Sequence, residues 1–255
     1  MSTIDIRPPG KRVIVPVRAS ALKTTHCPLK YQQTCVRGLQ SNDVKQQLLF
    51  GTAIHAAVEA RGRGAALAQI VQDVLPTYTG NQQELLVKCI MCMPEPAPAY
   101  VWRGQPMVEF RFEHDWYETV IDDVTYVIRL CGTIDHVVFR DDGYVIITDW
   151  KSTSKWKANE VFDDYRHSVQ MRFYLWVCRR FGHEIGLPPE LADACAANRQ
   201  FLRIGGIFKS GQPCWKLGPP IPFDEDQFDE FELALKNIIH NVVLPAWSSP
   251  DSAPP

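Results

Sequence analysis

Three charged residues in one apolar stretch have the types and the spacing that metal-dependent chemistry requires. Asp149 and Lys151 are two positions apart, so on a strand they share one face while the intervening Trp150 points to the other. Asp135 lies in the preceding run of β-branched and apolar residues. Two carboxylates and one lysine can hold a divalent cation and stabilise negative charge on a substrate.

The segment Asp141-Asp142-Gly143 between the two runs predicts a tight turn and therefore a β-hairpin. A three-residue loop places Asp135 directly opposite Asp149, and a five-residue loop gives the same pairing. A two-residue loop would place Asp135 opposite Trp150 instead and remove it from the Asp149 face. Directly opposed side chains have Cβ atoms ~4.5 to 5.5 Å apart, where like charges repel. The first register therefore predicts a cation between the carboxylates, for which Mg²⁺ is suited.

Either carboxylate alone is more often a cap or a solvated polar side chain. The combination with a lysine in an apolar hairpin favours a functional site, because clustered buried carboxylates need a compensating charge. The alternative of a surface ion cluster on an α/β protein without a catalytic site here stays open.

Asp135, followed after a short hairpin by Asp149-Trp150-Lys151, resembles the core of the PD-(D/E)XK nuclease superfamily. Gly132 to Asp135 matches the GxxD form of its RecB-like exonuclease branch. Trp150 and Ser152-Thr153 depart from the commoner DYKT form. Three other segments resemble motifs of that branch in the same order: Ser20–Leu22 with Cys27–Tyr31 its N-terminal helix, Gly51–His55 its histidine motif, and Gln170 with Tyr174 its downstream helix motif.

The resemblance implies an α/β fold of the restriction-endonuclease type, with a mixed, partly antiparallel sheet flanked by helices and an N-terminal helical part. It also implies hydrolysis of phosphodiester bonds in DNA with Mg²⁺ or Mn²⁺, and an imidazole ligand favours Mn²⁺. Relatives carry a glutamate at the position of Glu109, which is therefore a site candidate, but a weaker one, because its strand alternates polar and apolar residues as any surface strand does; Glu113 is its rival. The implied metal ligands are His55, Asp135 and Asp149, and the implied catalytic residues are Asp135, Asp149, Lys151, Gln170 and Tyr174.

RecB-like relatives are often exonucleases in recombination, repair or phage DNA processing. By resemblance we therefore expect an exonuclease that acts on DNA, with a helicase or a recombination protein as a candidate partner. A catalytically silent relative that binds nucleic acid or acts as a scaffold is the alternative.

Net charge does not indicate nucleic-acid binding, because the chain of 255 residues carries −2. Residues 151–180 hold seven basic and three acidic residues, net +4, whereas residues 221–240 hold one basic and six acidic residues, net −5. The basic segment lies beside the hairpin, where a phosphate backbone would run. There is no apolar run of ~18 residues and no secretory signal, so we expect a cytoplasmic protein without a membrane span.

Eight cysteines are irregularly spaced, and a reducing compartment disfavours disulfides. Some RecB-like relatives hold an iron-sulfur cluster with one N-terminal cysteine and three close to the C-terminus. Cys27 matches the first position, but the later cysteines are dispersed. We therefore expect buried thiols rather than a cluster.

The order of elements predicts one large domain. Helices are expected over about 42–60, from after residue 64 to about 75, and over 82–91, 159–181 and 224–243. Strands are expected from about 106 and over 201–209. The expected division is an irregular or extended lead-in over 1–18, a nuclease-like domain over 19–247 with a helical part (19–93) and a core (106–247), and a disordered tail over 248–255.

Overall fold

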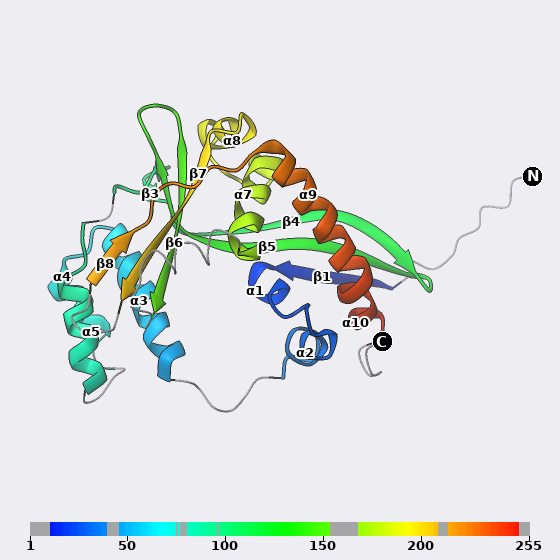
Figure 1. Ribbon diagram of the computed structural model, residues 1–255, viewed down its shortest axis with the longest axis horizontal. Coiled ribbons are helices and arrows are strands. Elements are labelled where there is room, and N and C mark those ends of the chain that lie inside the picture. Colours follow the sequence, from blue (N-terminus) through cyan, green and yellow to red (C-terminus); the bar gives the residue numbers. More distant parts are fainter. Residues whose placement is uncertain are drawn as a thin grey trace, which may run out of the picture. The chain divides into compact units, whose positions relative to one another are not determined.

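A computed structural model describes residues 11–39, 46–74, 76, 81–95, 97–153, 168–208 and 214–249 (Figure 1). Contacts divide the chain into two compact units that interleave along the sequence. The first unit comprises residues 1–40, 112–132 and 233–255, and the second comprises residues 41–111 and 133–232. The division into a helical part and a core stays a prediction, and the expected tail lies outside the described residues apart from 248 and 249.

Hydrogen bonds join six strands in the order β1-β5-β6-β7-β8, with β4 paired to β5. The sheet is mixed, because β1 with β5 and β6 with β7 are parallel pairs, whereas β5 with β6 and β7 with β8 are antiparallel. A separate two-stranded sheet pairs β2 with β3. The strands are β1 (Arg12–Arg18), β2 (Val101–Trp102), β3 (Gln105–Pro106), β4 (Val108–Ile121), β5 (Val124–Phe139), β6 (Val145–Thr153), β7 (Gln200–Phe208) and β8 (Cys214–Leu217).

Helices accompany the strands in both units. The first unit holds α1 (Ala19–Leu22), α2 (Pro28–Tyr31), the π-helical turn Gln32–Val36, a second π-helical turn Ile239–Val243 and α10 (Leu244–Ser248). The second holds α3 (Gln46–Gly62), α4 (Leu67–Val74), α5 (Asn81–Met91), α7 (Val169–Phe181), α8 (Pro189–Ala196) and most of α9 (Glu225–Ile238). No helix in the described part of the chain has both the length and the apolar character needed to span a bilayer.

In the first unit, β1 forms in the segment where the sequence predicted an irregular or extended lead-in. Its alternating β-branched residues favour a strand, and Val15 and Val17 are buried. Pro16 cannot donate to a strand ladder, but β1 ends the hydrogen-bonded order of the sheet, where a proline is tolerated. The strand pairs in parallel with the first half of β5.

In the second unit, the β5–β6 hairpin has a three-residue loop, one of the loop lengths that the sequence left open. Arg140 N–H donates to the Tyr144 carbonyl at 2.9 Å, so the loop consists of residues 141–143. Gly143 has φ +80°, the left-handed conformation that ends such a loop and that glycine adopts without strain. This turn fixes the register of the two strands.

The apolar core of the second unit is built around Trp150. Its side chain is 3% exposed and belongs to a buried cluster with residues of α3, α4 and α5. The indole meets Trp215 of β8 edge to face, with ring centroids 5.7 Å apart. Gly205 on β7 is the register partner of Trp150, and a Cβ added to this glycine would lie 2.3 Å from the Trp150 indole. The glycine is therefore what allows the ring to lie flat on β7.

The expected α/β fold, a mixed sheet flanked by helices, is confirmed. In the second unit α3 contacts β6 and α7 contacts β7. The helix expected over 159–181 begins at Val169, and residues 154–167 lie outside the described part of the chain. The short elements α8 and β8 were not expected. The helix expected over 224–243 changes to π-helical geometry at Ile239.

Candidate active site

Asp135 and Asp149 lie on adjacent strands at the point where β5 and β6 stop pairing through their backbones. The ladder runs from Phe139–Val145 to His136–Thr148, and one further step brings Asp135 opposite Asp149. There, Asp135 Oδ2 accepts a hydrogen bond from the Trp150 backbone N–H at 2.7 Å. The Asp135 side chain thus accepts the hydrogen bond that a backbone carbonyl of β5 would accept if the ladder continued. The geometry holds the Asp135 carboxylate against β6.

Asp149 is a buried carboxylate that accepts hydrogen bonds from the Lys151 ammonium group and the Gln170 amide. It is 2% exposed, and Lys151 Nζ lies 2.9 Å from its Oδ1 and 2.7 Å from its Oδ2. Gln170 Nε2 donates to the same Oδ1 at 3.1 Å. Lys151 reaches Asp149 because residues two apart on a strand share a face. The pair keeps an ammonium group at a fixed place in the site.

Helix α7 brings Gln170 and Tyr174 to this pair. Its first turn is fixed by the Ser168 side chain, which accepts a hydrogen bond from Met171 N–H. Gln170 Nε2 lies 3.4 Å from the Tyr174 hydroxyl, one helical turn away. Burial raises the pKa of Tyr174 to about 12, so its hydroxyl keeps its proton.

His55 approaches the carboxylates from α3. Its Nδ1 lies 3.5 Å from Asp135 Oδ2, and about one third of its side chain is exposed. Burial, together with the charge of Lys151, lowers the pKa of His55. The imidazole is therefore neutral near pH 7, the form in which histidine binds metals.

Glu109 enters the site through an unusual backbone conformation. It has φ +51°, in the left-handed region that non-glycine residues rarely adopt. An irregularity of this kind inside a strand redirects side chains, and Glu109 is half-buried rather than exposed with the polar face of β4. Burial and the charge of Glu59 raise the pKa of Glu109. The alternation in the sequence could not show this conformation.

His55, Glu109 and Asp135 form a group that fits a divalent cation. One ligand atom from each lies within 4.8 Å of the others. Burial and the nearby Asp149 carboxylate raise the pKa of Asp135 well above its usual value. The positive charge near these carboxylates is therefore too small to balance both of them when they are ionised. One imidazole with two carboxylates is a ligand set that suits Mg²⁺ or Mn²⁺.

The structure thus gathers all seven residues singled out in the sequence into one region of the second unit, although it distributes them differently. Glu109, the weaker candidate, stands beside His55 and Asp135, whereas Asp149 is held by Lys151 and Gln170. Glu113, the rival of Glu109, belongs to the first unit and pairs with Arg129 at 3.4 Å. Sequence reasoning missed Gly205, for which a glycine pair inside a strand pattern was the available signal.

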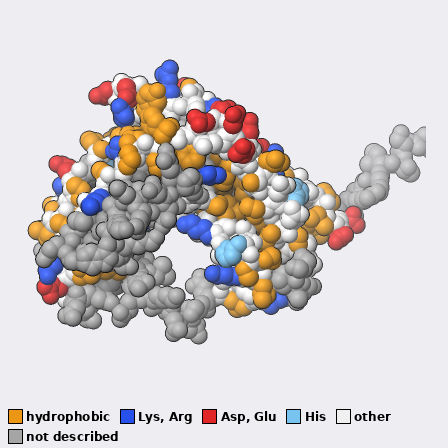
Figure 2. Space-filling model, viewed as in Figure 1, with side chains coloured by type: hydrophobic (Ala, Val, Ile, Leu, Met, Phe, Trp, Pro, Cys, Tyr) orange, Lys and Arg blue, Asp and Glu red, His pale blue; other side chains and the backbone are white. Residues whose placement is uncertain are grey.

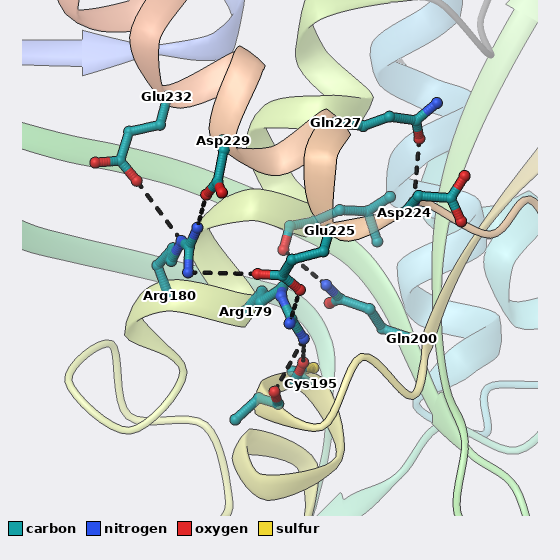
Figure 3. A network of polar contacts seen from close by, with 11 residues as sticks. Arg179, Arg180, Cys195, Gln200, Asp224, Glu225, Gln227, Asp229 and Glu232 are labelled. Atoms are coloured by element: carbon teal, nitrogen blue, oxygen red, sulfur yellow. Dashed lines mark hydrogen bonds and ion pairs between the residues drawn. The ribbon is translucent and has the colours of Figure 1, made fainter.

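The basic segment 151–180 does not present all its charge to a substrate. Arg179 pairs with Glu225, and Arg180 pairs with Glu225, Asp229 and Glu232 of α9 (Figure 3). Arg179 also donates to the Cys195 and Ala196 carbonyls at 3.1 and 2.9 Å, at the end of α8. The acidic segment therefore neutralises these two arginines, which corrects the expectation that they run along a phosphate backbone. Lys155, Lys157 and Arg166 lie outside the described residues.

The solved structures that match this chain have little sequence in common with it. A protein of Eubacterium rectale provisionally named an exonuclease is 13% identical, with 92% of this chain and 82% of that chain covered and a TM-score of 0.47. A second, the protein SSO0001, is also 13% identical, with 86% of each chain covered and a TM-score of 0.29. No curated protein matches the chain significantly.

The family model of the PD-(D/E)XK nuclease superfamily matches residues 19–251. The match includes both strands of the hairpin, α3 and α7, and so every residue of the site described above. With this match over most of its length, the chain belongs to the PD-(D/E)XK nuclease superfamily.

Proposed function

We propose that the protein is a divalent-metal-dependent deoxyribonuclease that hydrolyses phosphodiester bonds. The observation that carries the proposal is the group of His55, Glu109 and Asp135 beside the Asp149–Lys151 pair. Carboxylates whose ionisation is opposed by burial, next to a neutral imidazole, favour a bound cation over an empty site. A structural ion cluster would pair these charges with lysine or arginine instead.

His55, Glu109 and Asp135 would hold Mg²⁺ or Mn²⁺, with Asp149 as a further carboxylate at the same place. Bound to these residues, such an ion lowers the pKa of a water molecule and polarises the scissile phosphate. The Trp150 N–H keeps Asp135 oriented for this role, because its hydrogen bond engages one carboxylate oxygen.

Lys151 would act on the substrate directly. Its side chain is 17% exposed, and its ammonium group, held by Asp149, stabilises the negative charge that builds up on the phosphate during attack. Gln170 and Tyr174 complete the arrangement by fixing the Asp149 carboxylate and therefore the lysine. In this proposal the two α7 residues orient the charged groups and exclude water from one side of them.

The finer assignment is an exonuclease of the RecB-like type that serves recombination, repair or phage DNA processing in the cytoplasm. It is supported by the order of sequence motifs from Ser20 to Tyr174. A helicase or recombination protein that delivers DNA is part of the same proposal.

The test is a digestion time course on linear and circular DNA, single- and double-stranded, with Mg²⁺ and Mn²⁺ compared. An exonuclease degrades linear DNA and leaves closed circles intact. Lys88→Gln, an exposed lysine on α5 that pairs with Glu84, is a matched control for loss of one positive charge. Metal-dependent cleavage by wild type and Lys88→Gln but not by Lys151→Ala supports the proposal, whereas cleavage that persists in EDTA or in Lys151→Ala contradicts it.

A further inference from the structure

The face of the sheet opposite the carboxylates carries Trp150 into the apolar core, and near the β5–β6 turn it carries side chains that the proposed chemistry does not use. On β6, Asp149 and Lys151 point to one side, and Thr148 and Trp150 point to the other. The parallel register pairs Ile146 with Phe201 and Thr148 with Arg203, so these β7 side chains lie on the Trp150 side. The face opposite the carboxylates therefore carries its own set of side chains near the β5–β6 turn.

Two aromatic rings on this face form a stack. The Tyr144 and Phe201 ring centroids are 4.9 Å apart, with the ring planes 20° from parallel. Both side chains are partly exposed, whereas Leu202, which alternates with Phe201 on β7, is fully buried. Exposed aromatic pairs of this kind can stack with planar groups of a ligand.

Two arginines flank the stack, Arg199 directly before β7 and Arg203 within it. Phe201 and Arg203 are two apart on the strand and therefore share one face. Within the described residues, neither Arg199 nor Arg203 has an ion-pair partner, and Arg203 Nε is buried without a hydrogen-bond partner. Arg199 Nη1 lies over the turn, 3.8 Å from where a Cβ of Gly143 would be.

A third arginine adds to this charge. Arg140 pairs with Asp142 at 2.5 Å. Burial and the nearby Arg140 also lower the pKa of Arg203. Arg140 is thus paired with an acid, whereas Arg199 and Arg203 have no ion-pair partner among the described residues and are the two guanidinium groups that can receive an anion. In Figure 2 the surface around the hairpin turn and the start of β7 carries basic, acidic and hydrophobic side chains.

We propose that Arg199, Arg203, Tyr144 and Phe201 form a binding surface for single-stranded nucleic acid, on the opposite face of the sheet from the carboxylates. Two residues four apart on a strand are separated by ~13 Å. Guanidinium groups at that separation contact two phosphates of one strand, while aromatic rings between them stack with bases of any sequence. Unpaired bases are required, because paired bases do not expose their faces to a ring.

This inference rests on the proposed function for its ligand, since a nuclease must hold the part of its substrate that is not being cut. Its test nevertheless measures the affinity for nucleic acid in the absence of metal, and this measurement does not depend on cleavage. The protein is assayed in EDTA by fluorescence anisotropy with a labelled oligothymidylate of about 16 nucleotides. Arg199→Gln and Arg203→Gln remove the positive charge and leave a polar amide, and Lys88→Gln is the control for charge.

We expect the double variant Arg199→Gln, Arg203→Gln to raise Kd about tenfold and to reduce the slope of log K against log salt by about 1.4. Phe201→Leu raises Kd for the single strand at least fivefold and changes Kd for a duplex by less than twofold. Lys88→Gln binds as wild type does. All variants cleave a saturating short oligonucleotide at the wild-type rate, and their melting temperatures show that they are folded.

A double variant with wild-type Kd and salt slope would overturn the proposed surface and leave the nuclease assignment intact. Equal losses on duplex and single strand, with no effect of Phe201→Leu, would overturn the assignment to single strands. A wild-type protein that does not cleave but loses binding in the double variant would overturn the proposed function and support this surface.

Discussion

The Trp150 backbone N–H donates to Asp135 Oδ2 at 2.7 Å, so a proposed metal ligand on β5 takes a place in the hydrogen-bonding pattern of β6. The hairpin brings Asp135 opposite Asp149, and this hydrogen bond to the backbone of β6 orients the Asp135 carboxylate. It satisfies a backbone donor at the end of the ladder and holds a carboxylate where burial opposes its ionisation. The same residue therefore carries a structural and a proposed chemical role.

Asp135→Asn should abolish metal binding and cleavage but raise the melting temperature of the metal-free protein. Burial and Asp149 raise the pKa of Asp135 in the folded state. As pH rises from the pKa of this group in the unfolded chain to its pKa in the folded chain, ionisation of Asp135 lowers the free energy of unfolding, and above the folded-state pKa the full penalty applies. The amide removes this penalty, and its oxygen can still accept the Trp150 N–H. The measurement is thermal unfolding in EDTA near pH 8, with the exposed Asp122→Asn as control.

A lower melting temperature for Asp135→Asn than for wild type would show that the ionised carboxylate stabilises the fold. That outcome would favour a structural ion cluster over a metal site.

Lys151→Ala should lower the cleavage rate ~100- to 1,000-fold, as removal of a positioned electrostatic group does, while metal affinity stays within a few fold. Asp149→Asn should differ, because it removes a charged group next to the metal ligands, so metal binding weakens and excess Mn²⁺ partly restores the rate. The measurement is cleavage rate against metal concentration for both variants. A Lys151→Ala protein that cuts at the wild-type rate would remove the nuclease mechanism proposed above.

The hairpin was predictable because its information is local. The Asp-Asp-Gly segment predicts a turn but leaves the loop length open; once the three-residue loop is known, the period of two fixes which residues face each other. The Gln170 and Tyr174 pair was predictable for a similar reason, since residues four apart on a helix share a face.

Two other features depend on tertiary structure and left no local signal. The positive φ of Glu109 occurs without a glycine or a turn motif, so the alternation of its strand indicated a regular polar face. The pairing of Arg180 with Glu225, Asp229 and Glu232 joins α7 to α9 across some 50 positions of sequence, and net charge by segment could not show that the two segments cancel.

His136 predicts a dependence of stability on pH. It is 2% exposed on β5, its Nε2 has no partner within the described residues, and burial lowers its pKa to about 4. In the unfolded chain histidine titrates near pH 6.5, so the unfolded state binds more protons between these values. Stability should therefore fall as pH drops from about 6.5 to about 4, by on the order of 3 kcal/mol.

The measurement is urea unfolding across this pH range for wild type, His136→Gln and the exposed control His183→Gln. We expect the slope of unfolding free energy against pH to decrease in His136→Gln and to stay unchanged in the control. Parallel curves for wild type and His136→Gln would show that other groups cause the acid sensitivity.

Gly205→Ala should lower both stability and activity, although Gly205 is not one of the proposed catalytic residues. The added Cβ would lie 2.3 Å from two ring carbons of Trp150, so the indole must move within a packed core. Overpacking of this kind costs about 1 to 3 kcal/mol. Because Trp150 lies between Asp149 and Lys151 on β6, its displacement should also shift both charged groups and lower the cleavage rate.

A second substitution separates this effect from a general loss of β-structure. Trp150→Leu removes the ring that the alanine meets, so Gly205→Ala should cost less in the Trp150→Leu background than in wild type, a coupling that a double-mutant cycle measures. Gly51→Ala is the matched control, because its Cβ meets only Ser152 Oγ at 3.4 Å and a helical alanine is favoured. Additive costs for Gly205→Ala and Trp150→Leu would contradict the contact between this glycine and the ring as the reason for the glycine.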